Sequence, residues 1–269
     1  MQIIVLGMHR SGTSLTTRLI NMMGAYVGPE GIYGFTPDNP KGFWERHDVV
    51  RCDASLLKLY PPACPGAIIT PWMTQWEVPE THARNLPIAM KTILLYMDGH
   101  RPWVVKDPYM CLTFEHWKPL LEVPVCVVIY RDPLEIAHSL TVVKNSVPSI
   151  EYGIAMWEYY AMSLLNASAG MPRVHVLHSD FLSDPVNTVH QLYHALVAQG
   201  VQGLRLPSNR EILAFIDPRL YRARADAGYR QQYQLTPHQQ ALAGMMQGQS
   251  QPPGTLTVSE RSLKLLGAV

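Results

Sequence analysis

The chain has 269 residues, of which 47% are hydrophobic and 16% are charged, and its formal net charge is +1. This composition excludes a disordered chain and a broadly basic nucleic-acid-binding protein, and the length suffices for one large α/β domain over residues 1–269. No apolar run approaches the roughly 20 residues of a membrane span, and no basic leader precedes the first apolar residues, so we expect a cytoplasmic protein.

The cysteines carry no metal-binding pattern. Cys52, Cys64, Cys111 and Cys126 show no C-x-x-C spacing and no paired histidines, which argues against a zinc site or a disulfide framework. We therefore expect free thiols and no bound metal.

The first predicted strand and the loop after it carry the clearest motif. Residues 2–6 are apolar and rich in β-branched side chains. An apolar stripe at helical spacing follows the loop, formed by Leu15, Leu19, Met22 and Met23. Between them, Gly7 and Gly12 have the spacing of a nucleotide phosphate loop, in which backbone N–H groups and a helix N-terminus surround an anion. The lysine that ATP- and GTP-hydrolysing loops place after the second glycine is absent, and Arg10 is the loop's only fixed positive charge, so the pattern indicates a different phosphate.

Loops dominate the next part of the chain. Residues 24–42 contain five glycines and three prolines, which predicts a long loop. A helix is predicted from about Phe43 to about Leu59, with Glu45 in its first turn. Residues 60–79 combine five prolines with Trp72 and Trp76, and a further helix is predicted over about residues 80–98.

Strands and amphipathic helices alternate from there to about residue 199. The runs at residues 103–107, 123–130 and 173–178 are typical of buried parallel strands. The Asp-Pro pairs at residues 132–133 and 184–185 each predict a helix that the aspartate caps and the proline begins, and another helix is predicted over 152–168. This alternation predicts an α/β fold of three layers, with a central parallel sheet flanked by helices.

The periodic signal weakens beyond Gln199. Four arginines gather there, at positions 219, 222, 224 and 230. We expect the tail over residues 249–269 to be poorly ordered.

Charged side chains follow the predicted strands. Arg10, Lys106, Arg131 and His178 all lie at or just past a strand's carboxyl end, where open parallel sheets bind their ligands. A salt bridge to a neighbouring aspartate would explain Lys106 or Arg131 taken singly. Three cations and a titratable histidine at one edge predict a polyanionic ligand.

The segment HRSGTSL at residues 9–15 resembles the 5′-phosphosulfate loop of the sulfotransferases that use 3′-phosphoadenosine 5′-phosphosulfate (PAPS), in the bacterial, carbohydrate and tyrosylprotein branches with arginine at position 10. YRDPLEIAHS at 130–139 resembles their 3′-phosphate motif, and KDP at 106–108 their lysine segment beside the sulfuryl group. NPKGFWE at 39–45 resembles a bacterial segment with an acceptor-side carboxylate. The match of HSDFLSDP at 178–185 is partial, since His178 replaces a tyrosine and Ser179 a glutamate. These motifs span residues 7–185 in the family's order.

The resemblance implies a P-loop NTPase-like fold and sulfuryl transfer from PAPS, with PAP as product, to an acceptor hydroxyl or, as second choice, an amine. It assigns the 5′-phosphosulfate to the backbone of Ser11 to Leu15, Gly12 included, with the side chains of Arg10, Thr13 and Ser14. It assigns the 3′-phosphate to Arg131 and Ser139. Lys106 and Arg10 would neutralise charge in the transition state.

Residues 24–100 are expected to form the acceptor side. Its walls are expected to include Tyr33, Phe35, Phe43, Trp44, Trp72 and Trp76, each of which could equally be core. The acceptor's identity stays open among small molecules, carbohydrates, lipids and peptides, and so does the oligomeric state, a homodimer included.

Four residues could act as the general base for the acceptor: His9, Glu45, His47 and Asp48. His9 lies inside the phosphate loop. On a helix starting near Phe43, Glu45 and Asp48 share a face and His47 points away, while a pair with Arg51 or Lys41 would explain Asp48. Glu45 is the predicted base, with His47 as the alternative.

Two other functional classes compete with this prediction. An atypical P-loop kinase would need Mg²⁺ carboxylates, for which Asp107 and Asp180 are the candidates. A non-catalytic nucleotide-binding protein would keep the loop and lack turnover.

Overall fold

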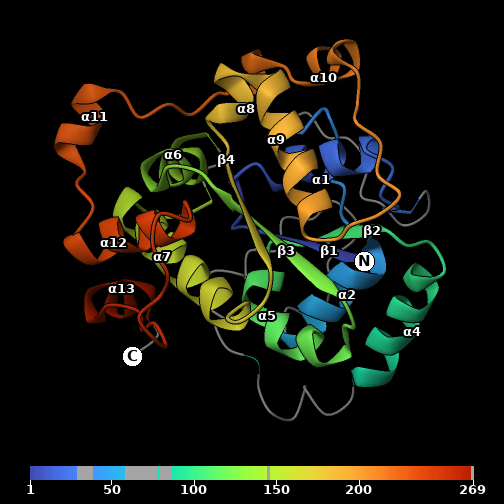
Figure 1. The fold of residues 1–269 in the computed structure, drawn as a ribbon. Helices are drawn as coiled ribbons and strands as arrows, with labels where there is room; N and C mark the ends of the chain where they lie inside the picture. Colours follow the sequence, from blue (N-terminus) through green and yellow to red (C-terminus); the bar gives the residue numbers. More distant parts are fainter. Residues whose placement is uncertain (29–38, 58–77, 79–85, 144–145, 268–269) are drawn as a thin grey trace.

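The computed structural model describes residues 1–28, 39–57, 78, 86–143 and 146–267. Its centre is a four-stranded parallel sheet in the order β2-β1-β3-β4 (Figure 1). The strands are β1 (Gln2–Leu6), β2 (Trp103–Lys106), β3 (Pro124–Tyr130) and β4 (Arg173–Leu177). All four were predicted within two residues of their observed bounds, because apolar β-branched runs flanked by turns are distinctive.

Helices cover both faces of the sheet. The first half of the chain contributes α1 (Thr13–Met22), α2 (His47–Leu56), α4 (Pro87–Asp98), α5 (Met110–Trp117), a 3-10 turn η2 (Lys118–Leu120), α6 (Pro133–His138) and the π-helical turn η3 (Ser139–Val143). The second half contributes α7 (Ile150–Ala167), α8 (Asp180–Ser183), α9 (Pro185–Ala198), α10 (Asn209–Phe215), η4 (Pro218–Leu220), α11 (Ala227–Gln232), α12 (Pro237–Met246) and α13 (Glu260–Leu266).

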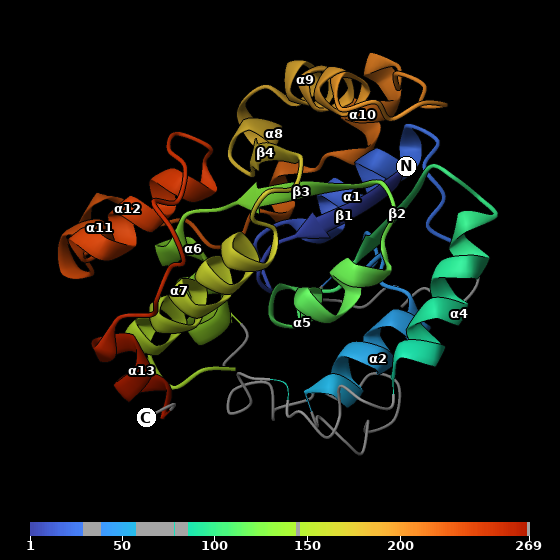
Figure 2. The same cartoon turned by 60° about the horizontal axis from the view of Figure 1, so that its bottom comes forward.

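The alternation of side chains along the strands divides the core into two layers. Ile3 and Val127 point to the face covered by α1, α9 and α10, whereas Ile4 and Val128 point to the face covered by α2, α4, α5 and α7. Figure 2 shows the sheet between these two helical layers. The predicted fold class, an α/β fold with a helix-flanked central parallel sheet, is thus confirmed.

The parallel register brings the strand ends to one edge. Val5 pairs with Lys106 on one side of β1 and with Val127 on the other, and Tyr130 pairs with Leu177. The glycine loop after β1 therefore lies beside the ends of β2, β3 and β4. The predicted Asp-Pro caps are present, since Asp132 accepts a hydrogen bond from the Leu134 amide at 2.8 Å.

Three sequence predictions differ from the structure. Helix α2 begins at His47, four residues later than predicted, because Trp44 has a left-handed backbone and Arg46 an extended one. The further helix begins at Pro87, and residues 80–85 of its predicted span lie outside the described residues. The tail, for which no helix was predicted, contains α13, which packs against α7 and buries Leu266.

A buried carboxylate anchors this C-terminal part. Glu158 of α7 is fully buried and accepts hydrogen bonds from the side chains of Gln239 and Ser262 at 2.8 and 2.6 Å and from the Ser259 amide at 2.7 Å. Helices α12 and α13 are therefore fixed by one side chain of α7. Among the described residues, no helix has the length and apolar character needed to span a membrane.

Candidate functional site

The loop between β1 and α1 has the shape of an anion seat. Gly12 is the N-cap of α1 with φ +97°, and a Cβ atom there would stand 2.3 Å from the His178 ring. A Cβ on Gly7 would stand 2.3 Å from the Ile129 side chain. Both positions therefore require glycine, as the sequence predicted. The first amides of α1, at residues 13–15, have no intrahelical acceptor by geometry and carry the positive end of the helix dipole.

Ser11 stabilises this loop by hydrogen bonds to another loop residue. Its amide and its hydroxyl both donate to the Met8 carbonyl, at 3.2 and 2.6 Å. Thr13 is buried, while the Ser14 hydroxyl accepts hydrogen bonds from Lys106 Nζ at 3.2 Å and from Asn39 Nδ2 at 3.4 Å. Ser11 therefore makes its hydrogen bonds within the loop, whereas Ser14 contacts side chains from outside it.

Lys106 joins the loop to the predicted base. It is the last residue of β2 and only 2% exposed, and its ammonium donates to Ser14 Oγ and forms an ion pair with Glu45 Oε1. Side chains separated by 61 residues in sequence are thereby brought together. A largely buried ammonium group therefore lies between the glycine loop and a carboxylate.

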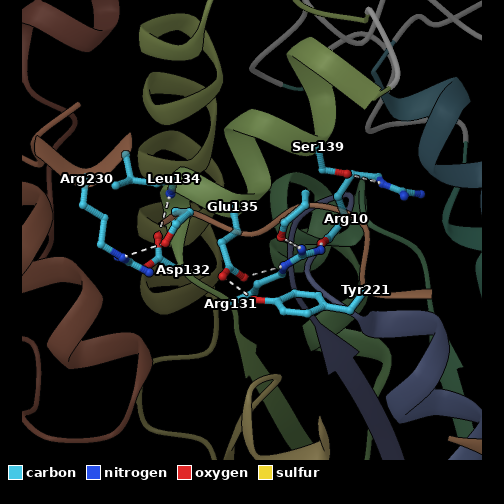
Figure 3. A network of polar contacts seen from close by, with 10 residues as sticks. Arg10, Arg131, Asp132, Leu134, Glu135, Ser139, Tyr221 and Arg230 are labelled. Carbon is cyan, nitrogen blue, oxygen red and sulfur yellow. Dashed lines mark hydrogen bonds and ion pairs between the residues drawn. The ribbon is translucent and has the colours of Figure 1, made fainter. Parts of the chain in front are cut away.

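Arg10 and Arg131 form the second half of the site (Figure 3). Arg10 has a left-handed backbone, φ +68°, and its Nε donates to the Ser139 hydroxyl at 3.0 Å. Arg131 Nη1 donates to the Arg10 carbonyl at 2.8 Å. Ser139 stands where α6 widens into the π-helical turn η3, a distortion that is common at functional sites. Arg10, which was predicted to bind the 5′-phosphosulfate, therefore contacts both residues that were predicted to bind the 3′-phosphate.

Arg131 has further partners that the sequence analysis missed. Its Nε contacts Glu135 at 3.2 Å, its Nη2 donates to the Ala223 carbonyl at 2.8 Å, and its guanidinium lies 5.0 Å from the Tyr221 ring centroid. The Tyr221 hydroxyl donates to Glu135, and burial together with this carboxylate raises the pKa of Tyr221 to about 12. Glu135 lies four residues after Arg131, a spacing that signals an ion pair on a helix, but Tyr221 and Ala223 belong to a segment without periodic signal.

The two buried histidines near the loop are neutral. Burial, assisted by Arg131, lowers the pKa of His178 to about 3, and its ring packs on Gly12 and lies 5.6 Å from the Tyr221 ring. Burial, assisted by Lys106 and Arg10, likewise lowers the pKa of His9 to about 3. The predicted group of three cations and a histidine is therefore three cations beside an uncharged imidazole.

The position of Glu45 differs from the predicted one on a shared helical face. Glu45 precedes α2, so it does not share a helical face with Asp48. Asp48 forms an ion pair with Arg46 at 2.6 Å. A pair was predicted for Asp48, but with Arg51 or Lys41 as the partner. Lys106, supplied by another strand, is the contact that fixes Glu45.

The expected acceptor wall is only partly described. Tyr33, Phe35, Trp72 and Trp76 lie outside the described residues, and Phe43 is half-buried. Trp44 has φ +60°, donates to the Lys41 carbonyl at 2.7 Å and stacks 4.5 Å from the Arg18 guanidinium carbon. Its ring packs against Arg18 of α1 and the core layer on that face of the sheet.

Asp107 and Asp180, the two candidate Mg²⁺ ligands of a kinase, have different surroundings. Asp107 is buried, and Asp180 accepts from Ser179 at the start of α8. Within the described ranges, no group of three histidine, cysteine or acidic residues could hold a metal ion. The described cysteines at positions 52, 111 and 126 are free thiols, and Cys64 lies outside the described residues.

Comparisons with known proteins place this site in a family. No curated protein sequence matches the chain. One solved structure, described as the sulfotransferase domain from the curacin biosynthetic pathway, is similar over 99% of this chain and 96% of its own, with 13% identity and a TM-score of 0.47. A family model described as "Sulfotransferase family" matches residues 2–199, a range that contains the glycine loop, Glu45, Lys106, Arg131 and Ser139. With almost three quarters of its length covered by that model, the chain belongs to the sulfotransferase family.

Proposed function

We propose that this protein transfers a sulfuryl group from PAPS to a hydroxyl group of its acceptor, with an amine as the second choice, and that it does so without a metal ion. The observation that carries the proposal is the position of Lys106, whose ammonium contacts both Ser14 of the phosphate loop and Glu45. This arrangement puts a cation and a base beside one anion seat.

The residues present fit the nucleotide. Gly7 and Gly12 let the loop backbone pack directly against the Ile129 and His178 side chains, and the amides of residues 13–15 at the start of α1 would hold the phosphate. Arg10 and Lys106 would add positive charge at the 5′ side. Arg131 and Ser139 would hold the 3′-phosphate through charge-assisted hydrogen bonds.

Each catalytic side chain has a defined task under this proposal. PAPS, when bound, supplies a sulfuryl group on a good leaving group. Lys106 and Arg10 stabilise the negative charge that grows on the oxygens around the breaking S–O bond. Glu45 accepts the proton of the acceptor hydroxyl as the new S–O bond forms. Since a sulfuryl group carries less charge than a phosphoryl group, cationic side chains suffice where kinases use Mg²⁺.

The role of Arg131 provides a test by calorimetry. Arg131→Ala should weaken binding of PAP by about 2 to 4 kcal/mol, typical for the loss of a buried charge partner, while it affects 5′-AMP much less. Arg230→Ala is the matched control, because Arg230 pairs with Asp132 at 2.6 Å on the outer side of the same network (Figure 3). Equal weakening of both nucleotides would remove Arg131 from the 3′-phosphate site.

A further inference from the structure

Two buried carboxyl groups lie behind the proposed catalytic pair, and the mechanism above uses neither. Asp53 belongs to α2 and is fully buried, and Asp107 follows Lys106 and is 2% exposed. Asp53 Oδ1 accepts hydrogen bonds from Thr113 Oγ1 and Trp117 Nε1, both at 2.7 Å. Asp107 Oδ1 accepts from the Tyr109 amide at 3.1 Å. One oxygen of each carboxyl is thus satisfied by α5 or by the turn before it.

The remaining oxygens leave a buried polar imbalance. Among the described residues, Oδ2 of Asp53 and Oδ2 of Asp107 are both buried and neither receives a hydrogen bond from a donor. The two carboxyl groups are held one turn apart on α5, because Thr113, which donates to Asp53, also donates to the carbonyl of Tyr109 at 3.3 Å, and the Tyr109 amide donates to Asp107. Each carboxyl group also influences the pKa of the other. Two buried carboxylates facing each other would repel, and each bare oxygen would cost free energy. One proton between them removes both penalties, as in other carboxyl pairs that share a site.

The electrostatic surroundings favour this arrangement. Burial is the main cause that raises the pKa of Asp53, to about 6, and the pKa of Asp107 further above its usual range, where the charges of Asp53 and Glu45 add to it. Lys106 acts in the opposite direction on Asp107.

Other titratable groups face the pair from the neighbouring elements. They are Cys52 of α2, Tyr109 before α5, Cys111 of α5 and Tyr160 of α7. Burial raises the pKa of each of these thiols and phenols, so all four are neutral around pH 7.

We propose that Asp53 and Asp107 share one proton and act as a clamp that fixes α2 to the residue after β2, and so positions Glu45 against Lys106. Glu45 lies eight residues before Asp53 at the entrance to α2, and Lys106 directly precedes Asp107. Helix from Asp53 back to His47 and the extended residue Arg46 connect the clamp to Glu45, and a single peptide bond connects it to Lys106. The clamp itself follows from the buried pair, whereas its catalytic consequence rests on the proposed sulfuryl transfer. Asp53 and Asp107 are positioning residues.

The pH dependence of the free energy of unfolding tests the shared proton without any substrate. A carboxyl whose pKa is raised by folding keeps its proton in the folded chain and loses it in the unfolded chain above about pH 4. Its contribution to stability is therefore complete below that pH and is lost as pH rises through the folded pKa. In Asp107→Asn, the amide can donate to Asp53 permanently while its oxygen still accepts from Tyr109, so this loss is absent.

The decisive experiment compares wild type with Asp107→Asn in urea unfolding between about pH 5 and pH 8. The midpoint of the wild type should fall relative to that of Asp107→Asn as pH rises, and the carboxylic acid C=O band in the infrared spectrum at about pH 7 should disappear in the variant. The control is Asp226→Asn, in which an exposed cap that accepts from the Tyr229 amide at 2.8 Å is changed in the same way. A midpoint difference that is independent of pH, together with an unchanged infrared spectrum, overturns the clamp.

Turnover then tests the positioning role separately. Asp107→Ala should lower kcat at least about tenfold with unchanged affinity for PAP, and Asp107→Asn should recover most of that loss. If unfolding and infrared spectra support the shared proton but kcat is the same in Asp107→Ala, the positioning role is wrong. If the wild type itself consumes no PAPS, the proposed function fails while the clamp is still decided by the unfolding data.

Discussion

Lys106 connects the glycine loop to Glu45 through a single ammonium group. It is buried at the end of β2, where Ser14 belongs to the anion-binding loop and Glu45 to the segment that precedes α2. A buried lysine needs a partner, and Glu45 supplies it. The same contact holds the carboxylate next to the loop where an acceptor hydroxyl would have to lose its proton.

Replacement of Glu45 by glutamine should separate chemistry from binding. Glu45→Gln retains the shape of the side chain but removes the base, so turnover should fall by at least about 10²-fold while PAP affinity stays within about threefold. Steady-state kinetics and calorimetry on the same preparation measure both quantities. Normal turnover in Glu45→Gln together with inactive His47→Ala would identify His47 as the base.

The cations of the site could be predicted from sequence, whereas their partners could not. Arg10, Lys106 and Arg131 each follow an apolar run, and parallel strands bring such ends to one edge. The contact between Tyr221 and Glu135 joins residues 86 apart, and Tyr221 belongs to a stretch without helical or strand periodicity. The neutral state of His178 depends on burial, which a single residue beside a strand does not reveal.

At the scale of elements, the strands were easier to predict than the helix starts. β3 is a continuous apolar run, and its pattern admits one interpretation. α2 has a weaker pattern, and its first residue is decided by the extended backbone of Arg46, whose side chain pairs with Asp48. The resulting shift took Glu45 out of the helix. Its role therefore rests on the contact with Lys106, which is a tertiary property.

The C-terminal helices offer a prediction about elements. Glu158→Ala should lower the free energy of unfolding by about 3 kcal/mol, because three buried donors of α12, α13 and the turn between them lose their acceptor. Urea unfolding followed by circular dichroism measures the change. The matched control is Glu260→Ala, since Glu260 is 90% exposed and pairs with Lys264 at 3.8 Å, and it should leave stability unchanged. An unaltered unfolding midpoint in Glu158→Ala would show that α12 and α13 are held by other contacts.

At the scale of the whole molecule, the parallel sheet gathers residues from distant parts of the sequence. The ends of β1, β2 and β3 contribute Arg10, Lys106 and Arg131, and the segments after α1 and α10 supply Glu45 and Tyr221. The family model ends at residue 199, before Tyr221, so the contact of this tyrosine with Glu135 is contributed by the part of the chain beyond the family match.

The central claim is metal-independent sulfuryl transfer from PAPS, and the most direct measurement is the release of PAP in excess EDTA. With PAPS and a panel of phenols, sugars, amines and peptides, the account predicts PAP release that depends on one class of acceptor and is undiminished by EDTA. Complete loss of activity in EDTA that Mg²⁺ restores, or phosphoryl transfer from ATP in place of PAP release, would contradict it.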